Sequence, residues 1–186
     1  MNKIFFLIVC CFLTGCLGSS LPSNFYLLQP QTNLNKISNK KFNIGVETVE
    51  IPAYVDKPQI VWQKKNSTEL TVSELNRWGE PLSEMIGRTL ISDLSKLMPY
   101  SFIKPKMFSR EDFTRIIFVE INRFDAVEGE TAYLDAWWSI SNADGEITAR
   151  GKTNLSAPIS LSYDSYVQAQ SILIGKMAEQ IAKKIN

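Results

Sequence analysis

The fold class is decided by one alternating stretch, Thr131-Ala-Tyr-Leu-Asp-Ala-Trp-Trp-Ser-Ile-Ser141. Every second side chain from Ala132 to Ile140 is apolar, whereas the positions between them are largely polar. A period of two is typical of a β-strand that buries one of its faces. The residues Asn142-Ala-Asp-Gly145 then indicate a turn. We therefore expect an antiparallel meander of strands at residues 114–124, 131–141 and 147–155.

Two long amphipathic helices are predicted around this meander, at residues 80–98 and 163–185. Pro81 suits the start of the first helix and Pro99 its end. Its apolar side chains recur at helical spacing, at Leu82, Met85, Ile86, Leu90, Leu94 and Leu97. This order of elements predicts one mixed α/β domain at residues 25–186. Shorter strands are expected at residues 25–28, 43–51, 60–62, 69–72 and 101–105.

The start of the chain resembles the signal of a bacterial lipoprotein. Lys3 precedes ten apolar residues, 4–13, which as a helix would rise only ~15 Å, half of what a membrane span needs. Leu13-Thr-Gly-Cys16 follows and is similar to the lipobox, in which the cysteine takes a diacylglycerol before cleavage on its amino side. We expect residues 1–15 to be a signal peptide and Cys16 to be lipidated. The alternative is an ordinary secretory signal with a chance cysteine.

Cysteine usage supports the lipoprotein interpretation, since the three cysteines stand at positions 10, 11 and 16. After cleavage the mature chain would keep only Cys16, already alkylated, so neither a disulfide nor thiolate chemistry is expected. Residues 16–24 would form the lipidated cysteine and a flexible tether. Leu17 resembles the residue found in outer-membrane lipoproteins, where aspartate marks retention in the inner membrane. We therefore expect an outer-membrane anchor and a domain that faces the periplasm.

Charge and residue types argue against several functions. Twenty basic and nineteen acidic side chains leave the chain nearly neutral, unlike a nucleic-acid-binding protein. Histidine is absent and the nine glycines form no phosphate-binding loop, which removes histidine-based catalysis and histidine metal sites. Glu128, Glu130 and Asp135 could form a carboxylate cluster of the kind that glycosidases use, but acids near a turn are more often a solvated loop. We expect no enzyme, no cofactor and no metal site.

The most specific features are two motifs, Ile51-Pro-Ala-Tyr-Val-Asp-Lys-Pro-Gln-Ile-Val61 and Asn76-Arg-Trp-Gly-Glu-Pro-Leu82. Together with the early Phe25-Tyr-Leu-Leu28, they resemble the PqiC/YmbA-type lipoproteins, the auxiliary lipoprotein family of ABC-type transporters. Lys57 stands where arginine is usual in that family, and Gly79 where alanine is usual. Because lysine lacks the planar fork of arginine, a bidentate contact is not expected at position 57.

The motif residues allow a structural and a functional interpretation. Tryptophan and proline at element boundaries commonly serve packing, and Arg77 would pair with a nearby acid. A structural role is therefore expected for Pro52, Asp56, Pro58, Arg77, Trp78, Glu80 and Pro81. The functional interpretation is a surface for another protein, because exposed aromatic side chains favour interfaces. Its candidate contacts are Tyr54, Trp62 and Trp137.

The resemblance implies a three-layer α/β domain of the anticodon-binding or TolB amino-terminal type, with a mixed sheet and two long helices. It further implies a non-enzymatic docking or adaptor subunit that works with an MCE-family protein in lipid transport between the inner and outer membranes. A homo-oligomeric ring of such subunits is part of this expectation. Two rivals stay open at this point: an enzyme of the envelope, and a stand-alone structural lipoprotein without a transport partner.

Overall fold

The computed structural model describes residues 21–106 and 112–185, so the predicted signal peptide and Cys16 lie outside the described residues. In the described part, eight strands form one mixed sheet, accompanied by two long helices, which confirms the predicted class. None of the described helices is long and apolar enough to cross a bilayer. The elements are β1 (Asn24–Tyr26), β2 (Asn43–Val46), β3 (Gln59–Gln63), β4 (Leu70–Trp78), α2 (Leu82–Leu97), β5 (Phe102–Pro105), β6 (Arg115–Val127), β7 (Thr131–Ser141), β8 (Ile147–Pro158) and α3 (Tyr163–Ala182).

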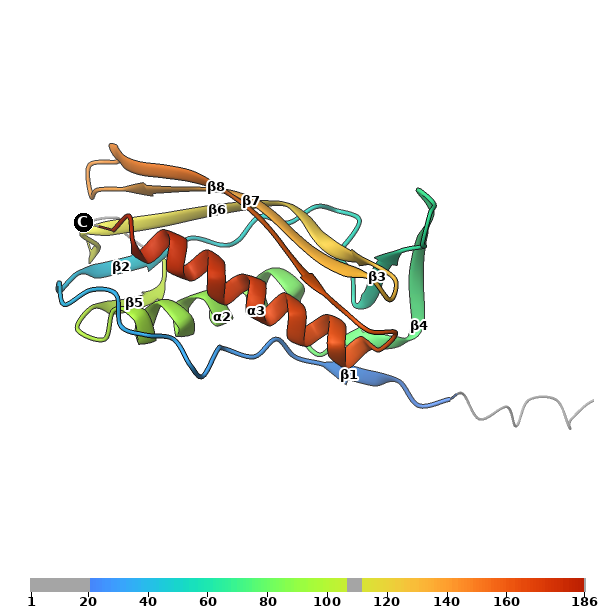
Figure 1. Cartoon of the computed structure of the whole chain (residues 1–186). Helices are drawn as coiled ribbons and strands as arrows, with labels where there is room; N and C mark the ends of the chain where they lie inside the picture. Colours follow the sequence, from blue (N-terminus) through green and yellow to red (C-terminus); the bar gives the residue numbers. More distant parts are fainter. Residues whose placement is uncertain (1–20, 107–111, 186) are drawn as a thin grey trace, which may run out of the picture.

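Strand β6 is the centre of the sheet (Figure 1). One of its edges pairs antiparallel with β7, and β7 pairs antiparallel with β8, which confirms the predicted meander. The other edge of β6 is shared by two parallel strands. β2 pairs with its first residues, and β3 meets its last residue, where Gln63 faces Val127. β5 flanks β2, while β4 and then β1 extend the sheet beyond β3.

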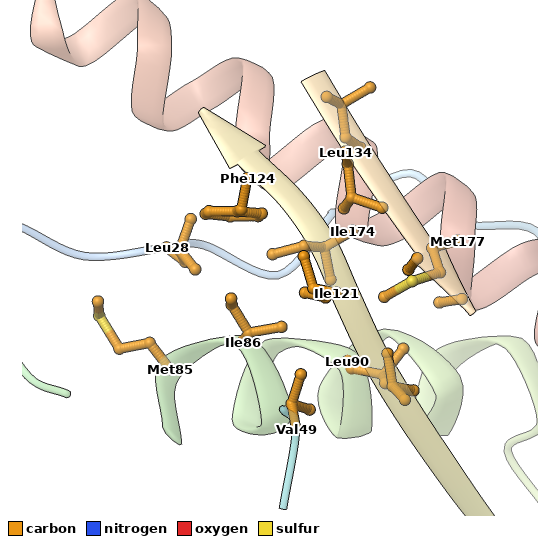
Figure 2. Close-up of a cluster of buried hydrophobic side chains, with 14 of the residues drawn as sticks. Leu28, Val49, Met85, Ile86, Leu90, Ile121, Phe124, Leu134, Ile174 and Met177 are labelled. Carbon is orange, nitrogen blue, oxygen red and sulfur yellow. The ribbon is translucent and has the colours of Figure 1, made fainter. Parts of the chain in front are cut away.

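Both helices cover the same face of this sheet (Figure 1). Figure 2 shows side chains from β6, β7, α2 and α3 meeting in one buried cluster, which Leu28 and Val49 complete. Burying one leucine, isoleucine or methionine side chain contributes about 1.5–3 kcal/mol, so this layer provides much of the stability. On β7 the alternation predicted from the sequence is confirmed, because the buried side chains are Ala132, Leu134, Ala136, Trp138 and Ile140.

An extended segment, residues 27–38, lies on the outer side of the helix pair, and we call it the strap (Figure 1). The backbone N–H of Gln29 donates to Ser171 Oγ on α3 at 3.0 Å. The N–H of Gln31 donates to Asp93 Oδ1 on α2 at 2.8 Å. The strap therefore crosses both helices and adds a third layer to the sheet and the helix pair.

Close packing holds the strap at both of its ends. Leu28 is buried in the hydrophobic core, and the N–H of Ile37 donates to the Leu97 carbonyl at 2.8 Å. At Gly175 on α3 a side chain would obstruct the strap, because an added Cβ would lie 2.5 Å from Gln31 Cγ. The N-terminal segment is thus built into the fold.

Several element boundaries differ from the prediction. The strand expected at residues 43–51 ends at Val46, although the Glu47 N–H still donates to the Ile117 carbonyl at 2.9 Å and a bridge joins Glu50 to Glu120. β4 continues to Trp78, because β1 provides a second partner for its last three residues. Pro81 is the N-cap of α2 rather than its first helical residue.

Asp93 is a buried carboxylate at the point where α2, α3 and the strap meet. Its Oδ1 accepts the Gln31 N–H, whereas Oδ2 has no hydrogen-bond partner among the described atoms. Burial raises the pKa of this carboxyl to about 6, although the Gln31 N–H and the charge of Lys96 lower it. The folded pKa exceeds the ordinary value of 3.8, so the folded state holds this proton more tightly than the unfolded chain does. The protonated Asp93 therefore stabilises the folded state at pH values below the ordinary pKa, and this contribution to the free energy of unfolding is lost as the pH rises through the folded pKa.

We predict that Asp93→Asn removes this part of the pH dependence. From about pH 4 to about pH 7, the free energy of unfolding of the wild type should fall relative to that of the variant, by at most about 3 kcal/mol. Urea unfolding at the two pH values measures the difference. Glu84→Gln is the control, because it removes an exposed carboxylate from the same helix. A wild-type-to-variant difference that is the same at both pH values would contradict this placement of Asp93.

Candidate interaction surface

The two motifs singled out in the sequence form one structural unit before α2. The N–H of Trp78 donates to the Pro58 carbonyl at 2.7 Å. One residue away, Gln59 pairs with Arg77 in the antiparallel ladder of β3 and β4. The first motif is thereby fixed to the strand that leads into the helix.

The loop of the first motif is a tight turn. The Pro52 carbonyl accepts the N–H groups of Val55 and Asp56 at 3.1 and 3.2 Å. The side chains of Asp56 and Pro58 are exposed, whereas Val55 is buried. The turn therefore presents one acid and one proline to solvent while it anchors itself through a valine.

The second motif carries the start of α2. Glu80 forms an ion pair with Arg88 on the first turns of the helix, and the carbonyl of Pro81 accepts the Met85 N–H at 3.1 Å. The expectation that Arg77 pairs with an acid is wrong: within the described residues Arg77 makes no ion pair, and its Nε is buried without a hydrogen-bond partner. The acid of its own motif, Glu80, is bound to Arg88 instead.

Trp78 is a core residue. It is 4% exposed, and its ring lies 6.0 Å from that of Tyr166 on α3 and 6.5 Å from that of Phe124 on β6. Tilted aromatic pairs at such distances add stabilisation beyond the area they bury. Trp78 therefore joins the strand before α2 to the sheet and to the other helix.

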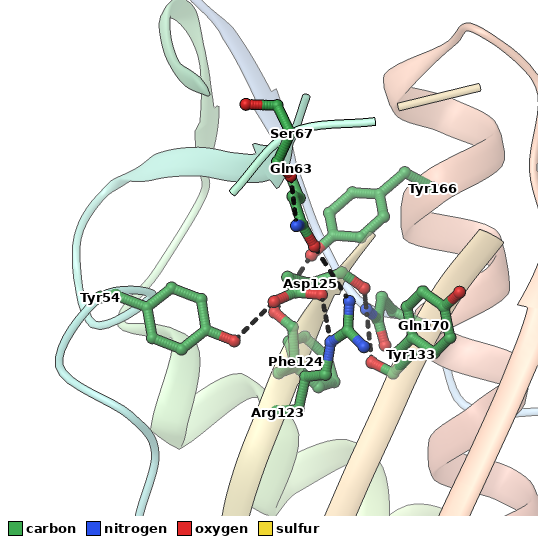
Figure 3. Close-up of polar contacts among 9 residues, drawn as sticks. All are labelled: Tyr54, Gln63, Ser67, Arg123, Phe124, Asp125, Tyr133, Tyr166 and Gln170. Carbon is green, nitrogen blue, oxygen red and sulfur yellow. Dashed lines mark hydrogen bonds and ion pairs between the residues drawn. The ribbon is translucent and has the colours of Figure 1, made fainter. Parts of the chain in front are cut away.

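Tyr54 is half-buried and bound to β6 (Figure 3). Its hydroxyl donates to Asp125 Oδ2 at 2.7 Å, and Arg123 Nε donates to Asp125 Oδ1 at 2.8 Å. The Arg123 guanidinium also lies 3.8 Å from the centre of the Tyr133 ring. Burial, and then the hydrogen bond to Asp125, raise the pKa of the Tyr54 phenol. Tyr54 thus ties the motif loop to the sheet, with only part of its ring left for a partner.

Gln170, on the helix side of the same strands, was missed in the sequence. Its side chain is fully buried, and its Nε2 donates to the carbonyls of Asp125 at 2.9 Å and Tyr133 at 3.2 Å. Together with Arg123 and Asp125, it makes a polar network through β6, β7 and α3 (Figure 3). The spacing of Arg123 and Asp125 on one strand face was a signal for their ion pair, but not for Gln170, which binds backbone carbonyls.

Trp62 was predicted to be an exposed contact for a partner, and the predicted exposure is wrong. It is 6% exposed, and its ring stacks on that of Tyr163 with centres 4.4 Å apart and planes at 19°. Tyr163 begins α3, so the stack closes the gap between β3 and the helix. A side chain held in this way would have to leave the core before it could contact a partner.

Trp137 does lie on an open surface. We call the face of β6, β7 and β8 that the helices leave uncovered the outer sheet face. Trp137 is 52% exposed there, between Glu120 on β6 and Lys152 on β8. Lys152 Nζ lies 5.3 Å from the Trp137 ring centre, a distance at which a cation is attracted to the face of the ring.

A shallow hollow of about 240 Å³ lies further along the outer sheet face, with Phe118, Ser139 and Ile147 in its lining. Ser139 is two residues from Trp137 on β7. Exposed aromatic and apolar side chains set among charges are typical of the anchor points of protein interfaces. The outer sheet face is therefore the candidate interaction surface.

Of the acids considered for catalysis, Asp135 lies on the same face of β7 as Trp137, two residues away, whereas Glu128 and Glu130 lie in the turn between β6 and β7. Glu130 forms an ion pair with Lys65 at 2.7 Å, Glu128 follows the end of β6, and Asp135 lies on β7 opposite Arg123 and Asn154. Across residues 21–106 and 112–185, no group of three or more acids or cysteines is arranged to hold a metal ion.

Two tryptophan variants separate packing from surface exposure. We predict that Trp78→Ala lowers the free energy of unfolding by about 3–5 kcal/mol, because it leaves a cavity between β6 and α3. Trp137→Ala should change it by less than about 1 kcal/mol, because the ring is half exposed. Chemical denaturation of both variants measures the two effects. Equal losses of stability would contradict the assignment of Trp78 to the core and Trp137 to the surface.

Comparison with known proteins connects this fold to a family. The chain is 23% identical to the intermembrane transport lipoprotein PqiC of Escherichia coli K12 over 189 residues, which cover 100% of this chain and 98% of PqiC. The PqiC of Shigella flexneri matches to the same extent.

Two crystal structures share the fold. One, of an uncharacterized protein, has a TM-score of 0.75 at 18% identity and covers 89% of this chain and 100% of its own. The other, from Xanthomonas campestris, has a TM-score of 0.69 at 12% identity, with 86% and 93% covered. The family of ABC-type transport auxiliary lipoprotein components matches residues 26–182, which is nearly all of the described domain. The chain belongs to the ABC-type transport auxiliary lipoprotein component family.

Proposed function

We propose that the chain is the outer-membrane-anchored periplasmic auxiliary subunit, a docking or adaptor protein, of an MCE/ABC-type system that transports lipids between two membranes. The observation that carries this proposal is the end-to-end similarity to PqiC, an intermembrane transport lipoprotein. The family match supports it independently, because the family is one of ABC-type transport auxiliary components.

The anchor in this proposal is Cys16, lipidated and held in the outer membrane. A single acyl chain binds a membrane only marginally, whereas several chains on one residue anchor it stably. Leu17 after the cysteine supports the outer rather than the inner membrane. The domain would then work in the periplasm at a short distance from the lipid surface.

The docking surface in this proposal is the outer sheet face with Trp137 as its anchor. The acid Glu120 and the base Lys152 flank the ring on the neighbouring strands. Such alternating charge around an aromatic centre suits a partner that is recognised by shape and complementary charge. We infer that the partner is an MCE-family protein, and assembly of several copies into a ring stays a prediction of the family resemblance.

We predict that a photoreactive residue at position 137 of the lipidated protein captures an MCE-family protein in intact cells. Trp137→Ala should weaken binding of the purified partner roughly thirtyfold, which corresponds to about 2 kcal/mol. The reason is that interface energy concentrates in a few aromatic anchors. Position 100 is the matched control, because Tyr100 is 55% exposed against 52% for Trp137 but lies between α2 and β5.

The outcomes of this experiment are distinct. Capture from position 100 and not from position 137 would place the docking surface elsewhere on a transport subunit. Capture from neither position, together with no effect of Trp137→Ala on envelope lipid composition, would contradict the transport role. It would favour a stand-alone structural lipoprotein of the envelope.

A further inference from the structure

Exposed apolar side chains gather where the N-terminal chain leaves the domain. Leu21 is 71% exposed, Phe25 66%, Leu27 45% and Ile172 41%. Phe25, Leu27 and Ile172 line the same open groove between the strap and α3, with a volume of about 400 Å³. We call these four side chains the anchor patch. Figure 1 shows the N-terminal chain leaving beside the start of α3, at the opposite end of the domain from the C-terminus.

The groove beside the anchor patch carries very little charge. Of the described residues that line it, Asp164 alone is charged, and the other polar ones are Tyr26, three glutamines and a serine. The exposed apolar side chains at this groove are Phe25, Leu27 and Ile172. On α3, Ile172 faces outward although its neighbours Leu173 and Ile174 are fully buried. Exposed apolar groups that adjoin one another mark a surface that is covered in the working state of a protein.

The position of the lipid anchor indicates what covers this surface. Fully extended, the residues from Cys16 to Leu21 span at most about 18 Å, and those from Cys16 to Phe25 at most about 32 Å. A lipid on Cys16 therefore keeps the anchor patch close to the bilayer. Because Gln29 and Gln31 of the strap are hydrogen-bonded to α3 and α2, the patch moves with the whole domain.

We propose that the anchor patch rests in the lipid surface beside the anchor and sets the orientation of the domain. This inference rests on the proposed lipidation of Cys16. The apolar side chains of the anchor patch enter the boundary between headgroups and acyl chains, as those of interfacial proteins do. Asp164 stays at the hydrated rim. The N-terminal end of the domain then faces the membrane. The turn between β7 and β8, at the far end in Figure 1, points away from the bilayer, and the outer sheet face stays open to a partner.

The mature chain allows a direct test, because its one cysteine is alkylated and any introduced cysteine is then a unique labelling site. Lipidated Phe25→Cys, Ile172→Cys and Ile147→Cys proteins, each labelled with a nitrobenzoxadiazole fluorophore, are reconstituted into vesicles of phosphatidylethanolamine and phosphatidylglycerol. Ile147 is the matched control, since it is 60% exposed but lies at the far turn. In vesicles with brominated acyl chains, the labels at positions 25 and 172 should lose more than half of their emission, and the label at position 147 should lose almost none.

The result that overturns the inference is protein that sediments with the vesicles while positions 25 and 172 are no more quenched than position 147. Emission that shifts to the blue without bromine quenching would also overturn it, because the patch would then be covered by protein, such as a second copy of the chain. A failure of the lipid anchor itself is detected separately, by sedimentation of the unlabelled proteins with the vesicles. If wild type sediments no more than Cys16→Ser, the lipidation in the proposed function is wrong, whatever the labels report. Retained circular dichroism of the three labelled proteins confirms that they are folded.

Discussion

The apolar inner face of β6 and β7 is the surface that the rest of the fold has to cover. Its side chains alternate with polar ones along each strand, so only one face of the meander requires burial. Both long helices pack on that face, and the core forms between them and the sheet. The opposite face, which the helices leave uncovered, carries charged residues such as Glu120 and Lys152 together with Trp137 and Phe118. The two faces of the sheet therefore differ: one is the core, and the other is the proposed docking surface.

Covering the sheet with two helices leaves a second apolar seam on the outside of the helix pair, and the strap closes it. Leu28 fills the seam, and the backbone of the strap is bound by Ser171 and Asp93. Asp93 makes this arrangement sensitive to pH, because a buried carboxylate with one unpartnered oxygen is destabilising when ionised. The strap therefore makes residues 27–38 part of the folded domain.

Local periodicity was sufficient to predict β7, α2 and α3, since each repeats one pattern over many residues. It was insufficient where a residue's environment comes from a distant part of the chain. The sequence predicts Trp62 to be an exposed aromatic on a short strand, but Tyr163, far along the sequence, stacks on it. Likewise the last residues of β4, up to Trp78, have partners on both sides, in β1 and at Pro58 and Gln59, which local periodicity does not reveal. In β6 a register shift between Ile121 and Arg123 interrupts the alternation, and the strand predicted to end at residue 124 continues to Val127.

The motif resemblance identified the family, whereas the structure showed what the motif residues do: Tyr54 binds Asp125, and Trp78 joins three elements of the core. The central claim of this account is that the strap makes the N-terminal segment an integral part of the fold. Residue-resolved amide hydrogen exchange on the lipidated protein tests it most directly. The account predicts that the amides of Gln29, Gln31 and Ile37 exchange as slowly as those in the middle of α2. Exchange of these three amides at the rate of an unstructured chain, with α2 still protected, would contradict it.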